Sequence, residues 1–270
     1  MKELKMIRTI CGDFFKRYNV IDDNSVDLFV IDPPYGNNYK DWDRIDFVKF
    51  TNKYMEICTR KLKSTGTIWN FSGYSNLFTH SKCKEGLVNI MEKFGFVHLE
   101  NWITWTRQKG RGSKKKLKSI KEEIIHFTNT EEYTWNNQLV KREVVVPYVK
   151  DGKPRGWILD LATGKRIRWT GMGNSWYYSS PYWNGILDRQ RHSAQKPFMM
   201  IERLILLSSN EDDLVIDPFA GSFTTAMVSK YLKRNYIGFE INKKFYKDSI
   251  DYIKSNYNRI IKYYMEGKLK

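Results

Sequence analysis

Two short segments of the chain nearly repeat each other, and they restrict the fold more than any other feature. "DLFVIDPPYG", Asp27 to Gly36, and "DLVIDPFAGS", Asp213 to Ser222, are each an apolar run that ends at an Asp-Pro pair. Such a run, bounded by turn residues, predicts a buried strand of a parallel sheet. Open parallel sheets bind ligands beyond the carboxyl ends of their strands, where Asp32 and Asp217 are expected. An Asp-Pro pair can also simply cap a strand and begin a turn.

Strands and helices alternate around both segments. Apolar, β-branched runs predict strands at 6–11, 26–32, 65–71, 95–107, 122–129, 213–217 and 235–240. Apolar positions at helical spacing predict helices over 47–62, 76–94, 196–209 and 222–233, and a further helix from Asn242. This alternation predicts an α/β fold with a doubly wound, mostly parallel sheet.

The composition is that of a basic globular chain. Hydrophobic residues make up 41% of its 270 residues, enough for a sizeable core. The formal net charge of +16 suggests a polyanionic partner, a nucleic acid or an acidic membrane surface, although it can also serve solubility alone. Cys11, Cys58 and Cys83 show no CxxC spacing, which argues against a disulfide framework or a zinc cluster, and we expect no metal. With no apolar leader and no run of transmembrane length, the sequence predicts a cytoplasmic protein without a membrane partner.

Residues 108–191 differ from the rest, because turns and glycines multiply and helical periodicity fades. The stretch "RQKGRGSKKKLK", Arg107 to Lys118, has seven basic residues and no acid, and "GKRIRW" and "GNSWYYSSPYW" follow it. A charge run is often only a solvated face. Basic residues interleaved with aromatics in an insertion favour a nucleic-acid surface. The predicted DNA-binding residues are Arg107, Lys109, Arg111, Lys114, Lys115 and Lys116.

The residues after the first apolar run suit chemistry on the amino group of a nucleobase. That nitrogen is a poor nucleophile, so acceptors must be aimed at its N–H groups. Asp32 offers a carboxylate and Pro33 a backbone carbonyl, while Pro33 and Pro34 fix the loop and supply no competing N–H. Tyr35 can stack on a base that has been flipped out of a duplex.

Three motifs together resemble those of the amino-methyltransferases of DNA. "DPPY" resembles their catalytic motif, "DPFAGSFTTA" their S-adenosylmethionine motif, and "HSAQKP", His192 to Pro197, the segment before it. Their order resembles that of the β group, a circularly permuted class I methyltransferase sheet with an inserted DNA-recognition region. The resemblance covers about Lys5 to Lys254 with gaps. It divides the α/β core into a catalytic half, 1–107, and a cofactor-binding half, 192–270, with an inserted target-recognition region at 108–191.

This resemblance implies a restriction-modification enzyme that methylates adenine N6 of a flipped base in double-stranded DNA, with S-adenosylmethionine as donor. It also implies a homodimer and a cognate restriction endonuclease. "DPPY" rather than "SPPY" favours adenine over cytosine. Three alternatives stay open: a cytosine-N4 enzyme, an RNA-base enzyme, and a catalytically impaired DNA-binding module on the same fold.

The resemblance also assigns the cofactor-binding residues. Asp217 and Gly221 belong to the loop beside the methionine part, and Glu240 matches the acid that binds the ribose hydroxyls. Asp13 resembles the position that meets the adenine ring, or it caps a helix; Lys196 meets the methionine carboxylate or stabilises the loop. The full set is Asp13, Lys196, Asp217, Phe219, Ala220, Gly221, Ser222, Thr224 and Glu240. Ser222 and Thr224 are expected to cap the following helix.

One residue departs from the pattern. The related enzymes have Gly-Ser-Gly-Thr-Thr where this chain reads "GSFTT", so Phe223 replaces a glycine. If the turn requires a positive φ there, the phenylalanine is strained. Either the turn is remodelled or cofactor binding is weakened.

Overall fold

The computed structural model describes residues 6–36, 41–79, 83–96, 98–113, 115–144, 149–151, 153–154, 156–178 and 194–267. Its centre is an eight-stranded sheet in the order β1-β13-β12-β2-β3-β5-β4-β11. These strands are β1 (Ile7–Cys11), β13 (Asn235–Glu240), β12 (Leu214–Asp217), β2 (Val26–Ile31), β3 (Leu62–Ser72), β5 (Lys116–Thr128), β4 (His98–Ser113) and β11 (Ser175–Tyr177). The first five are parallel, and β5 runs antiparallel to both β3 and β4. The α/β fold with a mostly parallel sheet is therefore confirmed.

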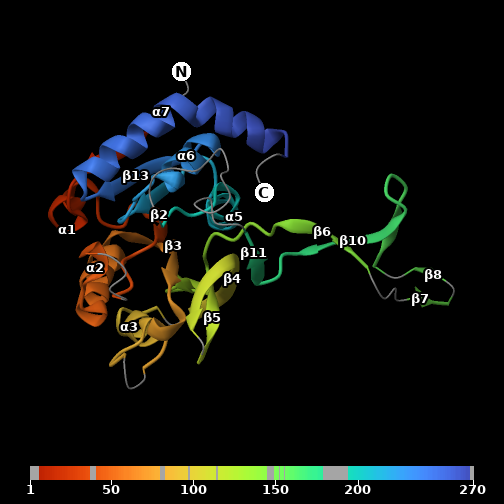
Figure 1. The fold of residues 1–270 in the computed structure, drawn as a ribbon, viewed down its shortest axis with the longest axis horizontal. Coiled ribbons are helices and arrows are strands. Elements are labelled where there is room, and N and C mark those ends of the chain that lie inside the picture. The colour runs from red at the N-terminus through yellow and green to blue at the C-terminus, as the bar shows by residue number, and fades with distance from the viewer. Residues whose placement is uncertain are drawn as a thin grey trace.

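Helices cover both faces of this sheet (Figure 1). One core cluster joins the sheet to α5 (Phe198–Ser208), α6 (Thr224–Tyr231) and α7 (Lys243–Met265). A second cluster joins the other face to α1 (Phe14–Arg17), α2 (Phe47–Lys61) and α3 (Leu87–Lys93). Short 3-10 helices span Tyr18–Val20, Asp41–Asp43 and Tyr74–Asn76. In the described part of the chain, no helix is both long and apolar enough to cross a membrane.

The helix predicted over 76–94 is much shorter in the structure, where α3 begins only at Leu87. Gly86 is its N-cap, and Val88 donates its backbone N–H to the carbonyl of Leu77 at 3.2 Å. A Cβ at Gly86 would lie 2.4 Å from the Leu77 oxygen, so the chain folds back closely on itself here. The apolar side chains near Leu77 therefore belong to a turn, although their spacing resembled that of a helix.

A second, smaller sheet extends from the body of the molecule (Figure 1). Its antiparallel strands are β6 (Leu139–Glu143), β10 (Lys165–Gly171) and β9 (Ile158–Asp160). A two-stranded hairpin, β7 (Val149–Lys150) with β8 (Lys153–Pro154), lies beyond it. The boundary predicted after residue 107 falls within β4, and β5 pairs with β3 inside the central sheet. The division into three regions stays a prediction.

Strand register places Asp32 and Asp217 at the same end of the sheet. β12 pairs with β2 in parallel, with Ile216 opposite Phe29. Asp217 is therefore level with Val30, and Asp32 follows two residues later. Since side chains alternate along a strand, both carboxylates are expected on the face that Val30 shares with α5, α6 and α7.

Candidate active site

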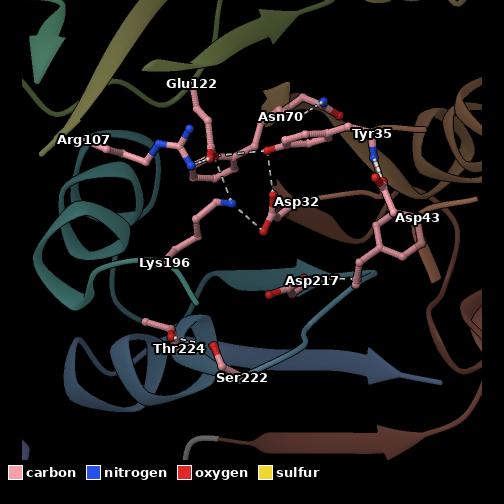
Figure 2. A network of polar contacts seen from close by, with 12 residues as sticks. Asp32, Tyr35, Asp43, Asn70, Arg107, Glu122, Lys196, Asp217, Ser222 and Thr224 are labelled. Carbon is pink, nitrogen blue, oxygen red and sulfur yellow. Dashed lines mark hydrogen bonds and ion pairs between the residues drawn. The ribbon is translucent and has the colours of Figure 1, made fainter. Parts of the chain in front are cut away.

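The loop of residues 32–36 follows β2 and is held by a network of hydrogen bonds (Figure 2). Asp43 accepts from the backbone N–H groups of Tyr35 and Gly36 at 2.6 and 3.0 Å. The Asn76 side chain donates to the Tyr35 carbonyl at 2.6 Å. These contacts come from two separate segments, so the loop is fixed by its surroundings as well as by its prolines.

The same loop brings an acid and a phenol together. The Tyr35 hydroxyl donates to Asp32 Oδ1 at 3.0 Å. Pro33 and Pro34 have no backbone N–H, and within the described residues nothing donates to the Pro33 carbonyl. The loop therefore offers two acceptors, the Pro33 carbonyl and the Asp32 carboxylate that the Tyr35 hydroxyl contacts.

Two cations, a second acid and the Tyr35 hydroxyl form a network with Asp32. Lys196 Nζ lies 2.8 Å from Asp32 Oδ2 and 3.3 Å from Glu122 Oε2. Arg107 Nη1 lies 2.9 Å from Glu122 Oε1, and the Tyr35 hydroxyl lies 3.4 Å from Glu122 Oε2. Figure 2 shows Lys196 reaching between the two carboxylates. We call these five residues, Asp32, Tyr35, Arg107, Glu122 and Lys196, the charge cluster.

Burial and mutual charge set the protonation of this cluster. Burial raises the pKa of Asp32, and Glu122 adds to this effect, while Lys196 and the Tyr35 hydroxyl oppose it. Burial alone would lower the pKa of Lys196, but Asp32 and Glu122 outweigh it and raise the pKa. Burial also raises the pKa of Tyr35, helped by the two acids. Lys196 is therefore a cation and Tyr35 a neutral donor.

The loop of residues 217–223 follows β12, the strand beside β2. Asp217 is buried and accepts from the Phe219 backbone N–H at 3.1 Å, and the Ala220 N–H donates to the Phe239 carbonyl at 2.8 Å. Burial raises the pKa of Asp217 to about 7, against hydrogen bonds from Thr225 and Phe219 that lower it. The charge of Asp32 also raises this pKa, so the two carboxylates are electrostatically coupled.

Glu240 ties this loop to the end of β13. Its Oε2 accepts from the Gly221 N–H at 3.0 Å and its Oε1 from the Asn242 N–H at 2.7 Å. Gly221 has a φ of +48°, which favours glycine. The Gly12 N–H donates to the Glu240 carbonyl at 2.8 Å, so the end of β1 lies beside it. Each Glu240 oxygen keeps a lone pair for a ligand.

Asp13 caps a helix, whereas the hydroxyls of Ser222 and Thr224 do not. Asp13 Oδ1 accepts from the Phe15 N–H at 3.0 Å and caps α1, which leaves Oδ2 for other contacts. The expectation that Ser222 and Thr224 cap α6 is wrong. Phe223 is the N-cap, and the two hydroxyls lie 3.0 Å apart and bond to each other.

Phe223 adopts the left-handed conformation that a glycine would take without strain. Its φ is +55° and its ψ is +30°. The side chain is fully buried, and its ring packs edge-on against Tyr246 with centroids 5.6 Å apart. The turn therefore keeps the glycine geometry, and the ring points into the core beneath α7.

The predicted DNA-binding residues are only partly described. Arg107 lies in β4, is 29% exposed at its side chain, and belongs to the charge cluster. Lys115 is exposed at the turn between β4 and β5. Lys114 and the side chains of Lys109, Arg111 and Lys116 lie outside the described residues.

Glu122 is a site residue that the sequence motifs did not indicate. Glu122 lies on β5, on the same face as the buried Ile124. A charged residue at a position where the strand alternation predicts an apolar one is the signal that could have identified Glu122. Lys196, predicted to meet the cofactor or to stabilise its loop, contacts Asp32 and Glu122. Among the described residues, no group of three or more His, Cys, Asp or Glu side chains could hold a metal ion.

Known proteins resemble this chain along most of its length. The family model described as DNA methylase, N6_N4_Mtase, matches residues 26–251. The type II methyltransferase M.HpaI of Haemophilus parainfluenzae is 30% identical over 93% of this chain and 75% of its own. M1.MboII of Moraxella bovis is 34% identical over 91% and 95%. The DNA adenine methyltransferase YhdJ of Escherichia coli (strain K12) is 30% identical over 88% and 79%.

Two solved structures share the fold at lower identity. The M1.HpyAVI-SAM complex superposes with a TM-score of 0.60 at 19% identity, covering 92% of this chain and all of that one. The cytosine-N4-specific PvuII DNA methyltransferase gives a TM-score of 0.62 at 19% identity, over 94% and 92%. At this identity the likeness concerns the fold alone.

Proposed function

The chain belongs to the DNA methylase family, and from that premise we propose a site-specific methyltransferase acting on adenine N6 of double-stranded DNA. The methyl donor in this proposal is S-adenosylmethionine. The observation that carries it is the placement of the 32–36 and 217–223 loops at the same end of two neighbouring parallel strands. One loop presents acceptors to an amino group, and the other provides a glycine turn beside a ribose-binding acid.

The residues around the 217–223 loop fit S-adenosylmethionine. The Tyr236 hydroxyl is buried, has no hydrogen-bond partner among the described residues, and interacts electrostatically with Asp217 and Glu240. Such an unpaired polar group is costly unless a ligand or water satisfies it. Glu240 would hold the ribose hydroxyls, and the Gly221 turn would let the backbone approach the methionine part. When bound, S-adenosylmethionine supplies a methyl group that is electrophilic because it is attached to a sulfonium.

The chain's own residues orient the base and handle its proton. Asp32 and the Pro33 carbonyl accept from the N–H groups of the adenine amine, which directs the nitrogen lone pair toward the methyl donor. Asp32 is placed to accept the proton that this nitrogen sheds as its bond to carbon forms. The Tyr35 ring would stack on the extruded base. No covalent intermediate with the protein is needed.

Two observations favour adenine over cytosine as the target. The catalytic loop begins with Asp32 rather than a serine, and the chain is similar to YhdJ, named a DNA adenine methyltransferase. Cytosine N4 is the second candidate, because the family model covers N6 and N4 enzymes and the PvuII neighbour is cytosine-specific. The test is to incubate the protein with unmethylated DNA and methyl-labelled S-adenosylmethionine. Digestion to nucleosides should yield labelled N6-methyldeoxyadenosine. Labelled N4-methyldeoxycytidine would establish the second candidate, and no label would reject both.

One face of the β6-β10-β9 sheet supports the proposed contact with DNA. Arg142 and Arg168 lie directly opposite each other on antiparallel strands, so their side chains share a face, and Arg166 follows on it. All three are exposed, and no acid pairs with them within the described residues. Like charges placed opposite each other destabilise a sheet, and the phosphates of a duplex would offset this. We call this set the arginine face.

We also propose that the protein is a cytoplasmic homodimer with a cognate restriction endonuclease. Its chain would divide into catalytic, recognition and cofactor-binding regions. The proposal also keeps Asp13, Phe219, Ala220, Ser222 and Thr224 as cofactor contacts. Light scattering tests the dimer, and methylation of host DNA at one short sequence tests the assignment to a modification system.

A further inference from the structure

Lys196 is a buried cation shared by two acids. It precedes Pro197, the N-cap of α5, and is only 8% exposed. Its ammonium lies 2.8 Å from Asp32 Oδ2 and 3.3 Å from Glu122 Oε2. It also lies 5.0 Å from the centre of the Phe71 ring. A cation in such a site depends on both carboxylates, because little water can reach it.

Both oxygens of Asp32 already accept a hydrogen bond. Oδ1 accepts from the Tyr35 hydroxyl at 3.0 Å and Oδ2 from Lys196 at 2.8 Å. The amino group of a target base is also an N–H donor and needs one of these oxygens. Each of these oxygens has a second lone pair, so Lys196 competes with the substrate amine for Asp32 Oδ2 without closing it off.

Glu122 offers both donors a second partner. Lys196 and the Tyr35 hydroxyl reach the same Glu122 Oε2, at 3.3 and 3.4 Å, slightly farther than they reach Asp32. Glu122 Oε1 is fixed by Arg107 at 2.9 Å. Lys196 can therefore move away from Asp32 and still be paired with a negative charge, because Arg107 holds the Glu122 carboxylate beside it.

We infer that Lys196 and Glu122 are positioning residues for the target base, and this inference rests on the proposed function. Without a base, Lys196 binds Asp32 Oδ2 and keeps that carboxylate ionised and oriented. When the base enters, its amino group replaces Lys196 on Asp32, and Lys196 shifts to Glu122. Substrate binding is therefore an exchange of one N–H donor for another on the same oxygen.

The two residues act on Asp32 with opposite sign. The groups facing Asp32 are Lys196 before α5, Tyr35 on its own loop, Glu122 on β5 and Asp217 on β12, and Arg107 acts through Glu122. The positive charge of Lys196 lowers the pKa of Asp32, and the negative charge of Glu122 raises it. Removing the Lys196 charge should therefore raise the pKa of Asp32, and removing the Glu122 charge should lower it.

The test compares Lys196→Met, Lys196→Arg and Glu122→Gln in methyl transfer to DNA as a function of pH. In Lys196→Met the acid limb of kcat/KM should move to higher pH, and activity should recover in alkaline buffer, where Asp32 ionises without help. Lys196→Arg should keep the limb near its original place. In Glu122→Gln the limb should move to lower pH, while kcat/KM for DNA on the plateau falls about tenfold or more, because Lys196 has no second carboxylate.

A second readout separates this inference from the proposed function. The Asp32 carboxyl is titrated by ¹³C NMR without substrate, its signal assigned by its loss in Asp32→Asn. Opposite pKa shifts in Lys196→Met and Glu122→Gln are expected even if the protein methylates nothing. Unshifted titrations, or a Lys196→Met variant that folds normally yet stays inactive at every pH, would overturn the inference. Absence of methyl transfer by the unmodified protein, with the shifts present, would reject the proposed function instead.

Discussion

The ring of Phe223 packs edge-on against the ring of Tyr246, with centroids 5.6 Å apart, while the Phe223 backbone holds a φ of +55°. A left-handed phenylalanine costs about 1–2 kcal/mol relative to glycine. Burying an aromatic ring stabilises a core by about 3–5 kcal/mol relative to alanine. The buried ring therefore outweighs the strain, so the sequence departure from glycine is compatible with a stable turn.

This balance predicts an unusual order of stability for substitutions at position 223. Phe223→Ala loses the ring and keeps the strain, whereas Phe223→Gly loses the ring and releases the strain. Both should be less stable than the parent, with the glycine variant more stable than the alanine variant by about 1 kcal/mol. Urea unfolding of the three proteins measures this order. An alanine variant as stable as the glycine variant would show that the turn does not impose the left-handed conformation.

The same packing predicts that Phe223 leaves cofactor binding intact. Its side chain is buried against Tyr246, whereas the contact with Glu240 is made by the Gly221 N–H. Calorimetric titration with S-adenosylmethionine should therefore give an affinity that changes less than about threefold in Phe223→Gly, below 1 kcal/mol. A large gain in affinity for the glycine variant would instead support the impaired-enzyme alternative.

The sheet could be predicted from the sequence because its central strands are buried on both faces. Continuous apolar runs at β2 and β12 end at Asp32 and Asp217, so the sequence itself marks where the strands stop. The prediction of one helix over 76–94 was wrong. Gly86 allows the chain to fold back on Leu77, and the spacing of apolar residues does not show such a turn.

The charge cluster could not be predicted in the same way. Asp32, Glu122 and Lys196 come from three distant segments, and their contact depends on how β5 pairs with β3. The motif resemblance placed Lys196 beside the cofactor or in a stabilising role before α5, because a motif relates only residues that are neighbours in the sequence. The sequence predicts strain at Phe223 if its φ is positive. The contact with Tyr246 that offsets this strain depends on where α7 packs, which the motif does not show.

Asp32→Ala should abolish methyl transfer while leaving DNA binding largely intact. The acceptor for the amine is removed, which we expect to lower kcat by at least about 10²-fold, whereas phosphate contacts set most of the DNA affinity. Paired assays of methyl transfer and DNA binding by fluorescence anisotropy measure both effects. Asp32→Asn is the matched control, because it keeps the shape but loses the charge. Transfer preserved in either variant would contradict the role of Asp32.

Asp217 should make the protein less stable as the pH rises. Burial raises its pKa in the folded state from 3.8 to about 7, so the folded protein binds the proton more tightly than the unfolded chain. Stability is then lost between about pH 4 and pH 7, by up to about 4 kcal/mol.

Asp217→Asn removes this titration while keeping an oxygen for the Phe219 N–H. The variant should therefore be more stable than the parent at pH 8, and the difference should shrink toward pH 4.5. Urea unfolding at the two pH values gives the comparison. Equal destabilisation at both would mean that Asp217 is not held near neutrality by burial.

The arginine face should contribute to DNA affinity by binding phosphates. Replacing Arg142, Arg166 and Arg168 with glutamine should weaken binding to any duplex and reduce the slope of log affinity against log salt, by about 0.9 for each phosphate that is no longer neutralised. The opposite face of the same sheet supplies the control. There Lys165 pairs with Glu143 at 2.7 Å and Lys141 pairs with Asp160, so these lysines are already neutralised. Lys141→Gln with Lys165→Gln should change the slope much less, and equal slopes for the two sets would place the DNA elsewhere.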